Sequence, residues 1–289
     1  MSLTVADYVG KVTVADGAWG TELDKLGCPP GFCREEWNVT DPDKIRTVAD
    51  AYISAGAQIL LTNTFGANQY VLGRHDRGDK VHDFNRAGAA ICKEAAGGKA
   101  KVFGSIGPSG KIVMMEEVSE DELFEAFKNQ AEALAEGGAD GLVIETMTEL
   151  SEAVAATRAA KTTGLLVVSC MTFDSGKTQT NTMMGVTPEQ AVEALTEAGA
   201  DIIGCNCGIG IDTYIEVTKL LRAATDKPIW VKANAGLPEI EGAKVVYKMT
   251  PEEYAGKVKH LITAGANIVG GCCGTSPEFI KAMVETVKK

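Results

Sequence analysis

Hydrophobic residues along this chain gather in short, nearly continuous runs, separated by longer stretches with helical spacing. The runs that have the length of a strand occupy residues 12–16, 58–64, 101–106, 140–146, 166–172, 201–206, 228–233 and 267–271. Continuous apolar runs, unlike alternating ones, are typical of parallel strands that are buried on both faces. The pattern therefore predicts a parallel sheet whose strands alternate with helices.

The stretches between the runs carry recognisable helix starts. A capping residue stands directly before proline at Asp41-Pro42, Thr187-Pro188, Thr250-Pro251 and Ser276-Pro277. Proline is well suited to the first helical position, and Ser, Thr and Asp are preferred as caps before it. Ser119 and Glu122 also have the spacing of a capping box in front of an apolar stripe. Each of these sites predicts the beginning of a helix.

A weak internal repeat indicates how the helices and strands are joined. Ala-Gly-Ala occurs at 55–57, 198–200 and 264–266, and Gly-Gly-Ala occurs at 137–139, in each case just before an even-numbered run. Glycine suits a left-handed helix exit, and small residues allow close packing. Eight strand-then-helix units without a break predict a (β/α)8 TIM barrel, as one domain over residues 1–289. The alternative is an open doubly wound sheet, but no G-x-G-x-x-G or phosphate-binding loop favours it.

Composition narrows the class of protein. The 289 residues carry a formal net charge of −11, which argues against partners such as nucleic acid or an anionic membrane. No apolar run approaches the roughly 20 residues of a membrane span, and the first residues lack the pattern of a signal peptide. The eight cysteines are partly clustered. We expect a cytoplasmic protein, in which clustered cysteines bind metal or perform chemistry.

Three of these cysteines are placed to share a metal ion. In a TIM barrel the active site lies at the carboxyl ends of the strands, and Cys207 follows the sixth strand while Cys272 and Cys273 follow the eighth. Catalytic zinc takes three protein ligands and keeps one position open. The residues alone do not distinguish this zinc site from two alternatives, a pair of buried cysteines and a vicinal disulfide. Cys205, two residues before Cys207, is a secondary candidate ligand one layer deeper.

The four remaining cysteines and the three histidines are expected to be structural. We interpret Cys28, Cys33, Cys92 and Cys170 as ordinary loop or core residues. The three histidines, His75, His82 and His260, lie in or beside predicted helices, away from the strand ends. We therefore expect none of them to be a metal ligand.

Carboxylates and polar groups also follow the strands. Asp16 and Glu145 end the first and fourth strands, and such a pair at one mouth favours binding of an ammonium group; a helix cap and a surface acid are the alternatives. The glycine-rich turn of Gly17, Gly20 and Thr21 offers backbone N–H groups to a carboxylate. Asn63, Thr64 and Asn68 either shape the pocket or satisfy loop backbone. Asn234 is a candidate to offer an oxygen to the open zinc position, with loop capping as the alternative.

Several segments together carry a family resemblance. They are DGAWGTEL (16–23), LTNTFGAN (61–68), GSIGPSG (104–110), ET (145–146), CNCG (205–208), KANAGLP (232–238) and GGCCGTSPEFI (270–280). Over about residues 12–282 the chain resembles the homocysteine S-methyltransferase family, most nearly the homocysteine-binding module of cobalamin-dependent methionine synthase. Trp19 and the segment CREEWN (33–38) depart from that pattern.

The resemblance implies a function and a set of roles. It implies a zinc-bearing barrel in which Cys207, Cys272 and Cys273 are the metal ligands and the catalytic residues. It implies that Asp16 and Glu145 hold the amino group of homocysteine, and that backbone near Gly17 and Ala18 holds its carboxylate. The expected reaction is zinc-dependent methyl transfer to the homocysteine thiol, which gives methionine.

The sequence also bears on the methyl donor. The sequence has no D-x-H-x-x-G cobalamin motif, so we expect methylcobalamin to be carried by a separate corrinoid protein that docks on the barrel mouth. One alternative is a betaine- or S-methylmethionine-type donor, cradled by Trp19, Trp37 and Phe65. Others are a non-catalytic thiol-binding subunit of a corrinoid system, and a lyase or aldolase, for which Lys232 is the candidate rim lysine without an evident partner.

Overall fold

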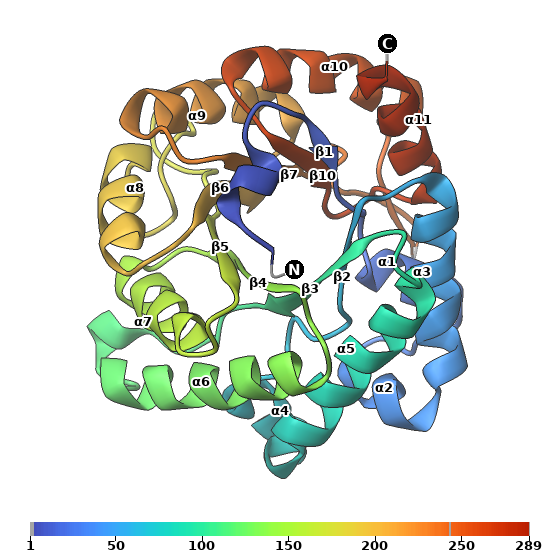
Figure 1. The fold of residues 1–289 in the computed structure, drawn as a ribbon, viewed down its shortest axis with the longest axis vertical. Helices are drawn as coiled ribbons and strands as arrows, with labels where there is room; N and C mark the ends of the chain where they lie inside the picture. Colours follow the sequence, from blue (N-terminus) through green and yellow to red (C-terminus); the bar gives the residue numbers. More distant parts are fainter. Residues whose placement is uncertain (1–2, 243, 289) are drawn as a thin grey trace.

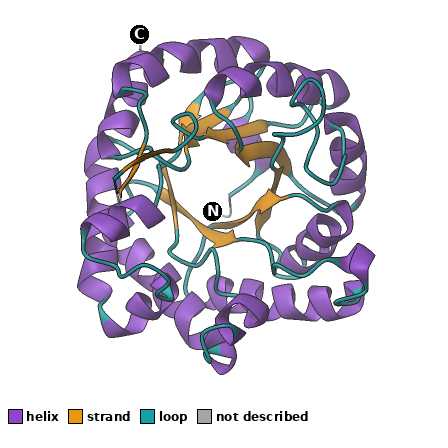
Figure 2. Cartoon of the chain, turned by 180° about the vertical axis from the view of Figure 1, so that it is seen from behind, coloured by secondary structure: helices purple, strands orange, loops and turns teal. Residues whose placement is uncertain are grey.

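Eight parallel strands form the inner wall of the protein, and helices surround them (Figures 1 and 2). The computed structural model describes residues 3–242 and 244–288. The strands are β1 (Thr13–Val14), β2 (Ile59–Leu61), β3 (Lys101–Ile106), β4 (Gly141–Met147), β5 (Leu166–Met171), β6 (Ile202–Cys207), β7 (Ile229–Ala233) and β10 (Ile268–Gly271). Their order in the sheet is β1-β10-β7-β6-β5-β4-β3-β2. A parallel bridge between Ala15 and Ile59 joins the two ends of this sheet, so the predicted (β/α)8 TIM barrel is confirmed.

The first two strands are shorter than their apolar runs. Residues 15–16 and 62–64 leave the regular ladder, although the chain still runs along the neighbouring strand. The Asp16 N–H donates to the carbonyl of Ile59 at 3.0 Å, and the Thr62 N–H donates to the carbonyl of Phe103 at 3.2 Å. These irregular strand ends are where polar side chains enter the mouth of the barrel.

The outer layer is helical. Its helices are α1 (Gly20–Lys25), α2 (Trp37–Thr40), α3 (Pro42–Ala55), α4 (Gln69–Gly73), α5 (Val81–Ala96), α6 (Glu120–Glu136), α7 (Leu150–Lys161), α8 (Pro188–Glu197), α9 (Ile211–Ala224), α10 (Pro251–Ala264) and α11 (Pro277–Val287). Short 3-10 turns occupy Val5–Tyr8, Arg34–Glu36, Gly78–Lys80 and Val113–Met115. All four predicted proline starts are confirmed.

The predicted caps are confirmed in part. Ser119, Thr187 and Thr250 each accept a backbone N–H with their side chains, as predicted. Asp41 and Ser276 make no such bond. Asp41 instead forms an ion pair with Lys44 at 3.0 Å, and the Ser276 hydroxyl donates to Glu278. A competing partner on the same helical turn therefore replaces the cap at these two sites.

Inside the barrel, aromatic side chains fill the end at which the strands begin. Phe103 and Trp230 face each other with ring centroids 5.9 Å apart. The N-terminal turn Val5–Tyr8 brings Tyr8 onto Phe103, with ring centroids 6.4 Å apart. The barrel is thus plugged at this end, and the space for a ligand lies at the opposite one.

The long segment after β7 contains a hairpin that the sequence pattern did not predict. Its antiparallel strands are β8 (Glu239–Glu241) and β9 (Lys244–Val246).

No described helix combines the length and apolarity that a membrane crossing requires.

Candidate active site

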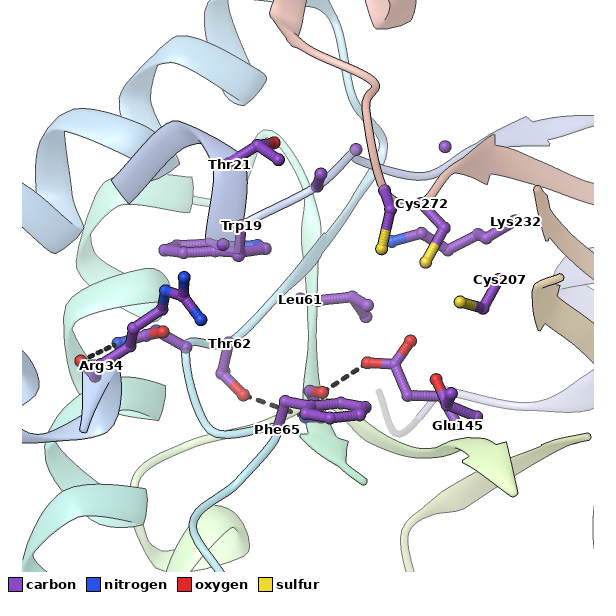
Figure 3. Close-up of a pocket in the computed structure, with 18 of the residues that line it drawn as sticks. Trp19, Thr21, Arg34, Leu61, Thr62, Phe65, Glu145, Cys207, Lys232 and Cys272 are labelled. Carbon is purple, nitrogen blue, oxygen red and sulfur yellow. Dashed lines mark hydrogen bonds between the residues drawn. The ribbon is translucent and has the colours of Figure 1, made fainter. Parts of the chain in front are cut away.

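A cavity of about 350 Å³ opens at the carboxyl ends of the strands, where the sequence predicted the site. One side of it carries Cys207, Cys272 and Cys273, its floor includes Glu145 and Lys232, and the facing wall includes Trp19 and Arg34. Figure 3 shows Cys207 and Cys272 on one side of this space and the Trp19 indole on the other. Of the predicted residues at the strand ends, Asn63, Glu145, Cys207, Cys272 and Cys273 meet in this cavity.

The three cysteine sulfurs form a compact group. Their Sγ atoms lie within 4.8 Å of one another, and among the described residues this is the group that fits a metal ion. β7 lies between β6 and β10, so Cys207 faces Cys272 and Cys273 across one strand. Two hydrogen bonds fix the Cys272–Cys273 segment to the end of β7: Cys272 N–H to Ala233 at 2.8 Å, and Ala235 N–H to Cys273 at 3.0 Å.

Backbone conformation turns these thiols toward one another. Cys207 has a φ of 67°, a left-handed conformation that is uncommon for any residue except glycine. Gly274 follows the cysteine pair with a φ of 82°. Cys205, in contrast, is fully buried in the layer between strands and helices and does not join the sulfur group. A left-handed backbone at a residue other than glycine, as at Cys207, is typical of functional sites.

The sulfurs share charge through hydrogen bonds. Thiol hydrogen bonds from Cys272 and then Cys273 lower the pKa of Cys207 to about 3. The bond to Cys207 in turn raises the pKa of Cys273 to about 11, and it also raises the pKa of Cys272. Cys207 is therefore the sulfur whose thiolate form its two neighbours stabilise. Soft thiolate ligands in this number suit zinc.

Asn234 lies against this group. Its Nδ2 is 3.6 Å from the Cys207 sulfur and donates to the carbonyl of Gly208 at 2.6 Å. Its Oδ1 is buried and has no hydrogen-bond partner. A buried oxygen without a partner is costly, and it fits the prediction that Asn234 serves the open metal position. The donor set as a whole thus fits zinc.

Glu145 is the buried acid of the cavity. It belongs to β4, and the Ser105 hydroxyl donates to it at 2.5 Å. Burial raises the pKa of Glu145, although the charge of Lys232 and the Ser105 bond act in the opposite direction. Glu145 lines the cavity, so a ligand cation would meet this carboxyl group.

Asn206 supports Glu145 and was missed by the sequence reasoning. Its Nδ2 lies 3.4 Å from Glu145 and donates to the Thr146 hydroxyl at 2.7 Å, while its Oδ1 accepts the Thr146 N–H at 2.7 Å. Thr146 has a φ of 64°, a genuine outlier for a β-branched residue. Asn206 holds this strained turn. Its place at the end of β6, between two cysteines, was the available signal.

Asp16 does not take the position that the sequence suggested. It is fully buried and does not line the cavity. Lys232 Nζ lies 2.5 Å from its Oδ1, and its Oδ2 accepts hydrogen bonds from the Leu61 N–H at 2.8 Å and from Trp19 Nε1 at 2.9 Å. Both oxygens are already engaged, so direct contact with an ammonium group is disfavoured.

Lys232 has a partner, contrary to the sequence interpretation. Burial alone would lower its pKa, but the carboxylates of Asp16 and Glu145 outweigh burial and raise it. A protonated lysine is not a nucleophile. The lyase or aldolase alternative, which needs an amine at this position, therefore loses its support.

Backbone and amide groups near the mouth are also partly engaged. The Ala18 N–H donates to Thr275 Oγ1 at 3.2 Å, and the Ala18 carbonyl accepts the Tyr52 hydroxyl at 2.6 Å. Gly17, Ala18 and Gly20 all line the cavity, but the Ala18 amide is already engaged by Thr275.

The asparagines after β2 support the loops. Asn63 Nδ2 donates to the Arg34 carbonyl at 2.8 Å and to Asn38 at 3.0 Å, although Asn63 also lines the cavity. Asn68 caps α4, and the Thr64 hydroxyl donates to the carbonyl of Ser105 at 2.8 Å. These residues satisfy loop backbone, and Asn63 also belongs to the pocket wall.

Of the three predicted aromatic residues, two reach the cavity. Trp19 and Phe65 line it, but Trp37 is buried under Lys44, whose Nζ lies 3.9 Å from its ring centroid. Tyr247 and Arg34 line the cavity and were not predicted. His75, His82 and His260 lie outside it, as expected.

Comparisons with known proteins agree with this geometry. The homocysteine S-methyltransferase family matches residues 13–287. Methionine synthase of Mycobacterium leprae is 31% identical over 96% of this chain, and that of Mycobacterium tuberculosis is 32% identical over 96%. The chain spans about a quarter of the length of these relatives, 24% and 25%.

A solved structure shares the fold. The metallated homocysteine methyltransferase MmuM from Escherichia coli superposes with a TM-score of 0.79 at 22% identity, covering 95% of this chain and 96% of that one. The family match covers nearly every residue that builds the barrel and its mouth. The chain belongs to the homocysteine S-methyltransferase family.

Proposed function

We propose that this protein binds zinc through Cys207, Cys272 and Cys273 and transfers a methyl group to the thiol of homocysteine, giving methionine. The observation that carries the proposal is the approach of three cysteine sulfurs to within 4.8 Å beside a buried carboxyl group in one cavity. Zinc, when bound, lowers the pKa of a coordinated thiol and so keeps it a nucleophilic thiolate at neutral pH.

The residues of the chain supply binding and orientation. Glu145 receives the ammonium group of homocysteine, because it is the carboxyl group on the cavity floor. The carboxylate of the substrate points toward the turn at Gly17 and Gly20 and toward Arg34 on that wall, whose guanidinium group is paired with Asp24 at 2.8 Å. Asn234, whose buried Oδ1 has no hydrogen-bond partner, would offer that oxygen to a bound metal ion. No general base is needed for the transfer of methyl to a thiolate.

For the donor we propose methylcobalamin on a separate corrinoid protein. Large apolar side chains are exposed on the loops that follow β2, β3, β5 and β7; they are Phe65, Met114, Met115, Met183, Leu237, Ile240 and Val245. Exposed apolar residues gathered at one end favour a protein partner. The methionine synthases that the chain resembles are longer than this chain, which supports a donor held on another unit.

A donor panel tests this proposal. The zinc-loaded protein is incubated with homocysteine and methylcobalamin, betaine, S-methylmethionine or methyltetrahydrofolate, and methionine is quantified. We expect methionine with methylcobalamin and none with the other three. Turnover with betaine or S-methylmethionine would assign the aromatic pair Trp19 and Phe65 to a cationic donor. If homocysteine binds but no donor yields methionine, the protein is a thiol-binding subunit and not the catalyst.

A further inference from the structure

The floor of the cavity contains a buried lysine that the proposed reaction does not use. Lys232 is 2% exposed and Asp16 is 0% exposed, and their Nζ and Oδ1 atoms are 2.5 Å apart. A buried ion pair is weak evidence for stability, since desolvation offsets much of the attraction. The pair therefore calls for an explanation in terms of the site.

The barrel is built to allow this contact. Lys232 lies on β7 and Asp16 follows β1, with β10 between these two strands. In the register Lys232 pairs with Gly270 of β10. A Cβ at Gly270 would lie 3.0 Å from the Lys232 Cγ and 2.9 Å from the Asp16 carbonyl oxygen. A missing side chain on β10 thus makes room for Lys232 to cross an entire strand.

Asp16 connects Lys232 to the opposite wall of the cavity. Its second oxygen accepts the Trp19 indole N–H at 2.9 Å and the Leu61 N–H at 2.8 Å. Trp19 is part of the cavity wall facing the cysteines. Lys232, Asp16 and Trp19 therefore form one hydrogen-bonded chain from the floor to that wall, which we call the floor relay.

Charge balance gives this arrangement a consequence for recognition. Asp16 and Glu145 carry one negative charge each and Lys232 carries one positive charge, so the floor has a net charge of −1. Two unpaired acids would place a charge of −2 against the single positive charge of the substrate ammonium group, whereas a net floor charge of −1 balances it. The negative charge that remains lies on Glu145, which lines the cavity, whereas Asp16 does not.

We propose that Lys232 and Asp16 are positioning residues: they neutralise each other, fix Trp19, and leave Glu145 as the single carboxylate that recognises the ammonium group of the thiol substrate. This inference rests on the proposed function for the identity of the substrate. It differs from a site in which Asp16 and Glu145 both contact the ammonium group.

A neutral replacement of the pair separates these two arrangements. The variants are Asp16→Asn, the double variant Asp16→Asn/Lys232→Gln, and Glu145→Gln, all zinc-loaded and checked for zinc content and thermal unfolding. Binding is measured by calorimetry for homocysteine and for 4-mercaptobutanoate, which lacks the amino group. The ratio of the two dissociation constants reports recognition of the amine without any methyl transfer.

The parent is expected to prefer homocysteine by about 30- to 100-fold, the usual effect of a charge-assisted hydrogen bond. Asp16→Asn frees Lys232 to pair with Glu145, and we expect the preference to fall below about threefold, because the floor becomes neutral. The double variant restores the net charge of −1, and we expect its preference to return to within about fivefold of the parent. Glu145→Gln abolishes the preference.

The double variant is decisive. If it binds homocysteine with no preference over 4-mercaptobutanoate, Asp16 contacts the ammonium group and the inference is overturned. The same holds if Asp16→Asn keeps the preference of the parent. Should Asp16→Asn alone not fold, the double variant still decides, because it buries no unpaired charge. Failure of the parent to bind homocysteine at all would instead remove the proposed function.

Discussion

The two sides of the cavity are built in different ways. The cysteine side consists of three residues of one type, and their place at the ends of β6 and β10 follows from the strand count. The Trp19 side consists of the unlike residues Trp19 and Arg34, with Asp16 buried behind Trp19, and their roles depend on contacts with distant parts of the chain. Chemistry on the first side is set by residue identity, whereas on the second side it is set by partners. Substitutions on the two sides should therefore fail differently.

The largest effect is expected at Cys273. Cys273→Ala removes one thiolate from the sulfur group, so we expect loss of bound zinc and a fall in methyl transfer on the order of 10³-fold or more, since changes behind the ligands alone cost about 10- to 100-fold. Zinc content by mass spectrometry and methionine formation check this. Cys205→Ala, a buried neighbour outside the group, is the control and should keep its zinc. Zinc retained by Cys273→Ala would exclude the three-cysteine site.

The next effect concerns Glu145, on the floor shared by both sides. Glu145→Gln should lower kcat/KM for homocysteine by about 30- to 100-fold, because a charged hydrogen bond to the substrate is lost. The same change should raise the unfolding temperature at pH 7.5. Burial raises the pKa of Glu145 above its ordinary value of 4.5, so the ionised form costs stability at neutral pH.

The pH dependence of this gain provides the control. A carboxyl group with a raised pKa favours folding below its unfolded pKa, and that contribution is lost as pH rises through the folded pKa. The stability difference between Glu145→Gln and the parent should therefore shrink as pH falls toward 4.5. A variant that is less stable than the parent at pH 7.5 would show that Glu145 is stabilised as a carboxylate.

Gly274 tests how far backbone conformation defines the cysteine side. Gly274→Ala places a Cβ at 2.2 Å from the Tyr247 ring, at a φ of 82°. We expect a loss of about 2–4 kcal/mol in the free energy of unfolding, from left-handed strain plus the steric clash, together with weaker zinc binding. Gly185 has a similar φ of 85° but no atom near its Cβ position. Gly185→Ala should lower the free energy of unfolding by about 1 kcal/mol. Equal losses in the two variants would show that the Tyr247 ring moves aside without a cost in stability.

The smallest effects separate two asparagines, one from each side. Asn234→Ala should speed the loss of zinc to a chelator by about 10-fold, an effect typical of groups beside metal ligands, with little change in stability. Asn63→Ala removes the bonds to Arg34 and Asn38, so it should cost about 1–3 kcal/mol of stability and leave zinc loss unchanged. Chelator kinetics and urea unfolding distinguish them. The reverse pattern would assign Asn63 to the metal and Asn234 to the scaffold.

The sequence by itself determined the barrel, the proline helix starts and the three cysteines. Apolar runs specify buried strands directly, and the position of a residue at a strand end is enough to place it at the mouth. The irregular features were less accessible. The β8–β9 hairpin and the competing partners of Asp41 and Ser276 depend on contacts that no local pattern records.

The roles of Asp16 and Lys232 were decided by the tertiary structure. As sequence, Asp16 is an acid after the first strand and Lys232 is a lysine without a partner 216 positions away. Closing the barrel brings β1 and β7 to either side of β10, and Gly270 leaves the space through which the two charges meet. The residue type alone shows that a side chain carries a charge. Whether that charge is free for a substrate depends on the groups within a few ångströms of it, because Coulomb attraction between buried groups acts through space.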